Sequence, residues 1–254
     1  MDNKVKVGIF KLTSCAGCQM VIVHMEEALL EINKYVSFEY FKMATSKNEE
    51  MQPVDIALVE GAVTTSEEVE ELKKIRKNSK VLVAIGSCAI TGGIPAMKND
   101  ISQVELERYV YKSMMPFASV KAYGLNEYVP VDAYLYGCPI EEDEFLQLMA
   151  NLLAGISPRF PAPSVCKECK IKGNYCLLVQ GKKACLGPIT RAGCDALCPS
   201  NGYPCIGCRG PSLDSNPRSL MEILLDKGYS RKEIKKLFEL FNSQASEFVG
   251  VTTQ

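Results

Sequence analysis

The chain has 254 residues, with 29 lysines and arginines against 30 aspartates and glutamates, so its formal net charge is -1. This length suits one large domain or two of ordinary size. Because basic residues do not collect into a patch, we expect neither nucleic acid nor an anionic membrane as a partner. There is no signal peptide and no apolar run of membrane-spanning length, which favours a cytoplasmic protein.

Residues 1–160 alternate apolar runs rich in β-branched residues, typical of buried strands, with segments of helical character. Strands are predicted at residues 5–10, 36–41, 54–60, 81–85 and 131–136, and helices at 19–32, 65–77, 104–114 and 141–153. Thr65 and Glu68 have the spacing of a helix capping box. The alternation of strand and helix predicts an α/β fold with a doubly wound parallel sheet.

Several prolines and glycines mark a domain boundary near residue 160. We therefore expect two domains, residues 1–160 and 161–254. Residues 166–208 show little periodicity, and we expect them to be folded by bound ligands rather than by an apolar core. Two helices are predicted after them, at residues 216–227 and 230–248, the second with a capping box of Ser230 and Glu233.

The twelve cysteines are the most informative feature of the sequence, which contains a single histidine. Twelve thiols make three sets of four, and four thiolates hold one iron-sulfur cluster or one zinc ion. In a reducing compartment such a pattern indicates metal binding rather than disulfides. The cysteines form an early group, Cys15, Cys18, Cys88 and Cys138, and a late group, Cys166, Cys169, Cys176, Cys185, Cys194, Cys198, Cys205 and Cys208.

Each cysteine of the early group follows a predicted strand. Loops at the carboxyl ends of parallel strands gather into one crevice, so we expect these four thiols to converge. Cys15 and Cys18 alone would also fit a redox-active dithiol, and isolated buried cysteines are a further alternative. Four thiols at one sheet edge favour a metal cluster.

The eight late cysteines lie within 43 residues and divide into two further sets of four. Structural zinc is the rival interpretation, and it would make the chain a colourless scaffold protein. Three sites in one chain, one of them assembled from distant loops, are more typical of a path for electrons. The spacing of the cysteines favours iron-sulfur clusters, but by itself it leaves structural zinc open as an alternative.

The chain resembles the small subunit of nickel-iron hydrogenases over nearly its whole length. It is most similar to the cytoplasmic, cofactor-linked branch, which includes the delta subunits of archaeal soluble hydrogenases, also called sulfhydrogenases. The resemblance implies a flavodoxin-like domain, then a small irregular iron-sulfur domain with C-terminal helices. It rests on five motifs in order: Cys15-Ala-Gly-Cys18, Val59-Glu60-Gly61-Ala62, Gly86-Ser87-Cys88-Ala89, Tyr136-Gly137-Cys138-Pro139, and the segment from Cys185 to Cys194.

By the same resemblance, the chain would hold three 4Fe-4S clusters. Periplasmic members have histidine where Cys166 stands, and many have proline near Cys198, which leaves a three-iron centre. Thiolates at both positions imply four-iron clusters here. They also imply a lower reduction potential for the distal cluster than a histidine ligand would give. The implied ligands are Cys15, Cys18, Cys88 and Cys138 for the proximal cluster, Cys166, Cys169, Cys176 and Cys185 for the distal cluster, and Cys194, Cys198, Cys205 and Cys208 for the medial cluster.

The function implied by the resemblance is electron transfer within a hydrogenase complex. The partners would be a nickel-iron large subunit and a subunit that binds flavin and NAD(P). The resemblance leaves open whether the complex contains a further iron-sulfur subunit. The complex would also be a candidate for sulfur or polysulfide reduction. No catalytic residue is expected on this chain, because it lacks the paired nickel-binding motifs and a GxGxxG segment.

A cluster subunit of a quinone-linked dehydrogenase shares the N-terminal fold, but it has adjacent cysteines where this chain has Cys15 and Cys18, and it lacks the late group. Glu60, at the end of a predicted strand, could lie near the proximal cluster or a subunit interface, or could cap the following turn. His24 lies on the first predicted helix, and no ligand role is expected for it.

Overall fold

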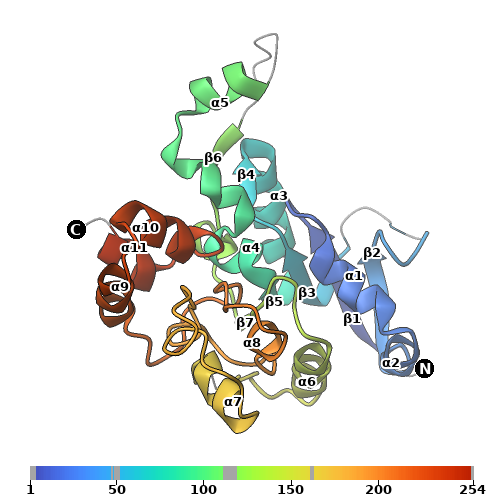
Figure 1. Ribbon diagram of the computed structural model, residues 1–254. Coiled ribbons are helices and arrows are strands. Elements are labelled where there is room, and N and C mark those ends of the chain that lie inside the picture. The colour runs from blue at the N-terminus through green and yellow to red at the C-terminus, as the bar shows by residue number, and fades with distance from the viewer. Residues whose placement is uncertain (1–3, 47, 49–51, 111–118, 161–162, 253–254) are drawn as a thin grey trace. The chain divides into compact units, whose positions relative to one another are not determined.

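The computed structural model describes residues 4–46, 48, 52–110, 119–160 and 163–252 (Figure 1). The chain divides into two compact units, Met1–Pro158 and Arg159–Gln254, which we call the first and the second unit. None of the helices in the described ranges combines the length and apolar character needed to cross a bilayer.

Five parallel strands form the main sheet of the first unit, in the order β2-β1-β3-β5-β7. This order corresponds to the flavodoxin-like order 2-1-3-4-5, and it confirms the predicted fold class. All five predicted strands are present. Their bounds are Val5–Lys11 for β1, Val36–Phe41 for β2, Val54–Glu60 for β3, Ser79–Ile85 for β5 and Ala133–Leu135 for β7.

The centre of this sheet is covered on both faces. Ile56, Ala57, Leu58 and Val59 of β3 are all buried, although successive side chains of a strand point to opposite faces. On one face, Ala57 and Val59 share a core with Leu72 and Ile75 of α3 (Ser66–Lys77). Burial on both faces explains why the strands are continuous apolar runs in the sequence.

The capping box predicted at the start of α3 is confirmed. The Thr65 hydroxyl accepts a hydrogen bond from the Glu68 amide at 3.1 Å, and the Glu68 carboxylate accepts one from the Thr65 amide at 3.2 Å. These two bonds satisfy backbone donors that the first turn of a helix leaves unpaired. The cap fixes where β4 (Val63–Thr65) ends and α3 begins.

One predicted helix of the first unit is wrong as a single element. Residues 19–32 form α1 (Gly17–His24) and α2 (Glu26–Ile32), which are separated at Met25, where φ is -79° and ψ is 50°. Met25 is buried, and Glu26 and Glu27 occupy the first turn of α2, where acidic side chains favour a new helix start. Neither glycine nor proline marks this break in the sequence.

The other helices of the first unit lie in the connections between strands or after the last strand. The predicted helix 104–114 corresponds to α5 up to residue 110, and its remainder lies outside the described residues. A two-stranded antiparallel sheet of β4 and β6 was not predicted, because strands this short show too little alternation. The bounds are Val63–Thr65 for β4, Ser119–Tyr123 for β6, Gly86–Thr91 for α4, Gln103–Val110 for α5, Glu142–Leu153 for α6, and Ile94–Asp100 and Leu125–Glu127 for the 3-10 helices η1 and η2.

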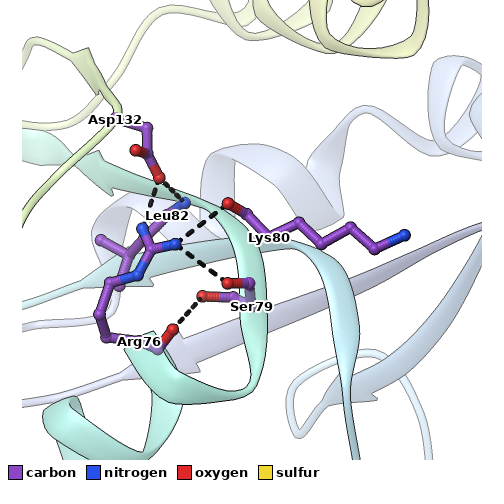
Figure 2. A network of polar contacts seen from close by, with 5 residues as sticks. All are labelled: Arg76, Ser79, Lys80, Leu82 and Asp132. Carbon is purple, nitrogen blue, oxygen red and sulfur yellow. Dashed lines mark hydrogen bonds and ion pairs between the residues drawn. The ribbon is translucent and has the colours of Figure 1, made fainter.

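A polar network fastens the end of α3 to the sheet (Figure 2). The Arg76 guanidinium pairs with the Asp132 carboxylate and donates to the carbonyl oxygens of Ser79 and Lys80, at 3.0 Å each. Asp132 also accepts a hydrogen bond from the Leu82 amide at 2.7 Å. The network therefore joins α3, β5 and the segment that leads into β7.

The second unit has an apolar core, contrary to expectation for residues 166–208. Leu178, Leu186 and Ile189, which lie between cysteines in sequence, pack in one buried cluster with Leu224 and Phe238 of the C-terminal helices. Apolar residues without periodicity can still share a core when other elements supply its opposite wall. The helices are Val165–Ile171 for α7, Leu197–Ser200 for α8, Pro217–Asp226 for α9, Arg231–Glu239 for α10 and Ser246–Thr252 for α11.

The predicted helix 230–248 is also wrong as a single element, since it is divided into α10 and α11. Its capping box of Ser230 and Glu233 is present. Asn242 lies in the intervening turn, is buried, and donates from Nδ2 to the carbonyl oxygen of Gly207 at 2.8 Å. A buried amide requires such a partner, and the turn lets Asn242 support the loop between Cys205 and Cys208.

Candidate metal centres

The four early cysteines lie at the carboxyl edge of the parallel sheet. Cys15 and Cys18 follow β1, Cys88 lies in α4 directly after β5, and Cys138 follows β7. In the flavodoxin-like order, the crevice between β1 and β3 is where the direction of strand addition reverses and where ligands bind. We call these residues the first thiol set.

The structure brings the first thiol set together. Burial raises the pKa of the Cys88 thiol to about 11, and the nearby Cys15 thiol acts in the same direction. Burial also raises the pKa of Cys138 to about 11, reinforced by Cys88 and Cys15, and it raises that of Cys18. Buried thiolates repel one another, so this arrangement suits a positively charged metal centre that compensates them.

Backbone groups crowd the sulfur atoms of this set. Gly86 has a φ of +81°, and a Cβ at this position would lie 2.4 Å from Cys18 Sγ. The amide of Gly17 donates to Cys15 Sγ at 3.4 Å, and the backbone at Ile140 and Ile94 acts likewise on Cys18 and Cys88. Amide donors stabilise thiolates and tune the potentials of iron-sulfur clusters. The residue types and the amide donors therefore suit an iron-sulfur cluster, although no described group of three or more such side chains is placed around a single metal ion.

Glu60 caps α1 from the end of β3. Its side chain is buried, and its two carboxylate oxygens accept hydrogen bonds from the amides of Cys18 at 3.2 Å and Gln19 at 3.3 Å. Ala16, the residue that precedes α1, provides no side-chain cap. Burial raises the pKa of the Glu60 carboxyl, while these two amide donors lower it. Glu60 therefore holds the backbone that carries Cys18, rather than the turn after its own strand.

Thr13 is a supporting residue that the sequence analysis missed. Its backbone pairs with Ala62, at 3.2 and 2.9 Å, and its hydroxyl contacts the side chains of Thr64 and Glu68, each at 2.7 Å. These contacts fix the loop that leads from β1 to Cys15. The only sequence signal was the small, polar character of residues 13–14.

Cys166, Cys169, Cys176 and Cys185 form the second thiol set. Cys166 and Cys169 lie on α7, and the other two lie in the loops that follow. Burial raises the pKa of Cys166 to about 11, and the three other thiols of the set act in the same direction. Burial likewise raises the pKa of Cys185, and Cys169 and Cys176 contribute. Cys166 Sγ and Cys185 Sγ both border Gly187, since a Cβ there would lie 3.4 Å and 3.6 Å from them, and Cys185 is buried while Cys176 is exposed.

The remaining four cysteines, Cys194, Cys198, Cys205 and Cys208, form the third thiol set. Burial raises the pKa of Cys205, and Cys208 contributes to the shift. Cys194 lies just before α8 and Cys198 lies within it. Cys185 of the second set acts on Cys205 in the same direction, and Cys194 and Cys198 lie on the preceding loop and helix.

Hydrogen bonds of Glu168 connect the helix of the second thiol set to the loop that carries Cys194. It lies on α7 between Cys166 and Cys169, and its carboxylate accepts hydrogen bonds from the amides of Gly193 at 2.7 Å and Ala196 at 3.0 Å. These amides flank Cys194. Across the described ranges, no three or more His, Cys, Asp or Glu side chains are placed so that a single metal ion could bind them all.

His24 lies apart from the thiol sets. It ends α1 and lines a cavity of about 380 Å³ together with Met25, Glu26, Glu27, Ala28, Glu142 and Leu146. No cysteine belongs to this lining, and the sequence analysis expected no ligand role for His24.

A flavodoxin-like sheet with thiols at its carboxyl edge is followed by a second unit rich in cysteine, and the relatives of this chain place it among oxidoreductase subunits. Residues 15–152 match the family model described as NADH ubiquinone oxidoreductase, 20 Kd subunit. The chain is 38% identical over 220 residues to sulfhydrogenase 2 subunit delta of Pyrococcus furiosus, covering 86% of this chain and 92% of the relative. The chain belongs to this family and, within it, to the small subunits of nickel-iron hydrogenases.

Two further comparisons agree with this assignment. The chain is 31% identical over 271 residues to a subunit of an F420-non-reducing hydrogenase of Methanocaldococcus jannaschii, covering 94% of this chain and 93% of the relative. It also resembles one polypeptide in the crystal structure of an NAD+-reducing [NiFe]-hydrogenase in the H2-reduced state. The TM-score is 0.56 and the identity 31%, with 63% of this chain and 96% of that polypeptide covered.

Proposed function

We propose that this chain relays electrons between an H2-activating nickel-iron large subunit and a flavin- and NAD(P)-linked partner, through three 4Fe-4S clusters held by the three thiol sets. The observation that carries this proposal is the grouping of the thiols. The first set lies at the ligand-binding edge of the sheet, and the second set reaches the surface at Cys176. The names of the relatives support hydrogen as the electron donor, and the NAD+-reducing neighbour supports a nicotinamide acceptor.

The proposed ligands are those implied by the motifs: the first thiol set for the proximal cluster, the second for the distal and the third for the medial. An iron-sulfur cluster supplies a site that accepts and releases single electrons. The protein residues hold the thiolates, exclude water through burial and direct amide donors at sulfur. Residues 1–160 would be the domain for the first set, and residues 161–254 the domain for the other two.

The proposed setting is the cytoplasm, where thiols remain reduced. The sulfhydrogenase relative also supports a test of sulfur or polysulfide as an acceptor for the whole complex. We infer no catalytic residue on this chain, so activity requires the large subunit.

The decisive experiment is metal analysis of the chain purified without oxygen together with its partners. We expect about twelve iron and about twelve sulfide per chain after partner clusters are subtracted, and a spectrum that bleaches on reduction with dithionite. About three zinc and no sulfide would replace this proposal with a structural scaffold. Quinone reduction in the absence of any hydrogen-dependent activity would instead support the quinone-linked dehydrogenase.

A further inference from the structure

The segment that carries the second thiol set is rich in lysine, although the whole chain has a net charge of -1. Residues 166–185 contain five lysines and a single acidic residue, Glu168. The Glu168 carboxylate is held by backbone amides near Cys194, and Lys172 pairs with Asp195. The other four lysines, Lys167, Lys170, Lys182 and Lys183, are exposed. The charge of this segment is therefore positive, in contrast to the chain as a whole.

Exposed apolar side chains lie within the same segment. Ile171, Tyr175 and Val179 are 76%, 58% and 69% exposed, and they flank the exposed Cys176 in sequence. The turn is well fixed, because the Val179 amide donates to Cys176 Sγ at 3.5 Å and the Gln180 side chain accepts from the Cys176 amide at 2.9 Å. An aromatic and aliphatic centre with a charged rim is typical of a protein interface.

The third thiol set provides a comparison within the same unit. Leu197, Tyr203 and Leu213 are also strongly exposed there. However, residues 194–214 carry no lysine, and their charged residues are Asp195, Asp214 and the buried Arg209. Exposed apolar residues thus occur beside both thiol sets, whereas the lysines accompany only the second. This difference points to a partner selected by charge.

We propose that residues 167–183 form a docking surface for an acidic electron-carrier protein that bears an iron-sulfur cluster. The carrier covers Tyr175 and Val179, and its carboxylates face the lysine rim. One electron passes from the chain to the oxidised cluster of the carrier, and no bond forms or breaks. Oxidation of one H2 by the complex supplies two electrons and releases two protons to water, so two carrier molecules are reduced in turn. This inference rests on the proposed function.

The test measures hydrogen-dependent reduction of a probe by the intact complex, with an acidic two-iron ferredoxin as the probe. Opposite charges accelerate association at low ionic strength, so the rate should fall as salt is added. The double variant Lys182→Glu/Lys183→Glu should slow ferredoxin reduction about tenfold at low salt. The matched control, Lys232→Glu/Lys236→Glu on α10, makes the same change in net charge and should stay within about twofold.

A second pair of variants tests the apolar centre. Tyr175→Ala should weaken ferredoxin reduction at high salt as well, whereas Tyr203→Ala, at a similarly exposed tyrosine beside the third set, should not. In all variants, reduction of benzyl viologen, a small dye, should be unchanged. An acidic subunit that dissociates from the Lys182→Glu/Lys183→Glu complex, but not from its control, would show that a resident subunit covers this surface, and would overturn docking of a carrier.

Equal slowing in both double variants, or a rate independent of salt, would overturn the docking surface. So would duplex DNA that binds the complex through these lysines while ferredoxin reduction is unaffected by their replacement. Iron and sulfide content separates the two proposals. Full content with no effect of the lysines rejects only the docking surface, while zinc without sulfide rejects the electron-transfer function itself.

Discussion

The backbone amide of Cys205 donates a hydrogen bond of 3.2 Å to Sγ of Cys185, so a residue of the third thiol set contacts a residue of the second directly. The next peptide strengthens the link, because the Leu186 amide donates to the carbonyl oxygen of Cys205 at 2.9 Å. Both cysteines are buried. In the proposed function, this contact is where the medial and distal sites meet.

Gly187 lies at this junction. A Cβ there would lie 3.4 Å from Cys166 Sγ, 3.6 Å from Cys185 Sγ and 3.8 Å from Cys205 Cβ, which is ordinary contact distance. Gly187→Ala should therefore fold, and its methyl group should lower the potential of the distal site, because reduction adds negative charge that a less polar surrounding disfavours. Redox titration followed by electron paramagnetic resonance measures the shift. Gly250→Ala, which meets no atom within 4 Å, should leave all potentials unchanged.

Gly86→Ala should abolish the binding of iron by the first thiol set. The added Cβ would lie 2.4 Å from Cys18 Sγ, so the sulfur would have to move. The expected result is a loss of about four iron per chain with the other two sites retained. Gly228→Ala is the control, because Gly228 also has a positive φ, +90°, but its Cβ would meet open space. That variant should lose only about 1 kcal/mol of stability and no iron.

Glu60→Gln should destabilise the first unit by about 1–3 kcal/mol. An amide side chain can accept one of the two hydrogen bonds from Cys18 and Gln19, and its NH2 group then faces the other buried donor. Denaturant unfolding without oxygen measures the change. Glu67→Gln, at an exposed position in the first turn of α3, is the control. Equal stability of both variants would show that the cap on α1 is unimportant.

Cys198→Pro tests the assignment of the third set. Cys198 lies in the first turn of α8, where proline is tolerated because its amide needs no helical partner. We expect the four-iron centre to become a three-iron centre, with a corresponding spectrum in the oxidised protein. Cys198→Ser, which retains an oxygen donor, should keep more of the fourth iron. Unchanged iron content in the proline variant would show that Cys198 is not a ligand.

Asp132→Asn should reduce stability by about 1 kcal/mol, because the ion pair with Arg76 is lost at a site that is only partly exposed. Thermal unfolding of the intact protein measures the effect. Glu70→Gln breaks the exposed pair of Glu70 and Lys73 on the same helix, and it should have almost no effect. A larger loss in the Glu70 variant would contradict the role given to the network in Figure 2.

Local pattern was sufficient for the strands, the capping boxes and the position of the four early cysteines after strands of one sheet. Buried parallel strands are continuous apolar runs, and cysteines that follow them reach one edge because all five strands point the same way. This is why Cys15, Cys18, Cys88 and Cys138 could be placed together from the sequence, although more than a hundred residues separate the first from the last.

The tertiary structure decided what depends on contacts between distant residues. The helix breaks at Met25 and before α11 carry no glycine or proline signal, and they follow instead from burial and from the bond between Asn242 and Gly207. The cap that Glu60 provides to α1 and the contact between Cys185 and Cys205 likewise join residues far apart in the chain. Periodicity records which face of an element is buried, but not which distant donor or acceptor the fold brings to it.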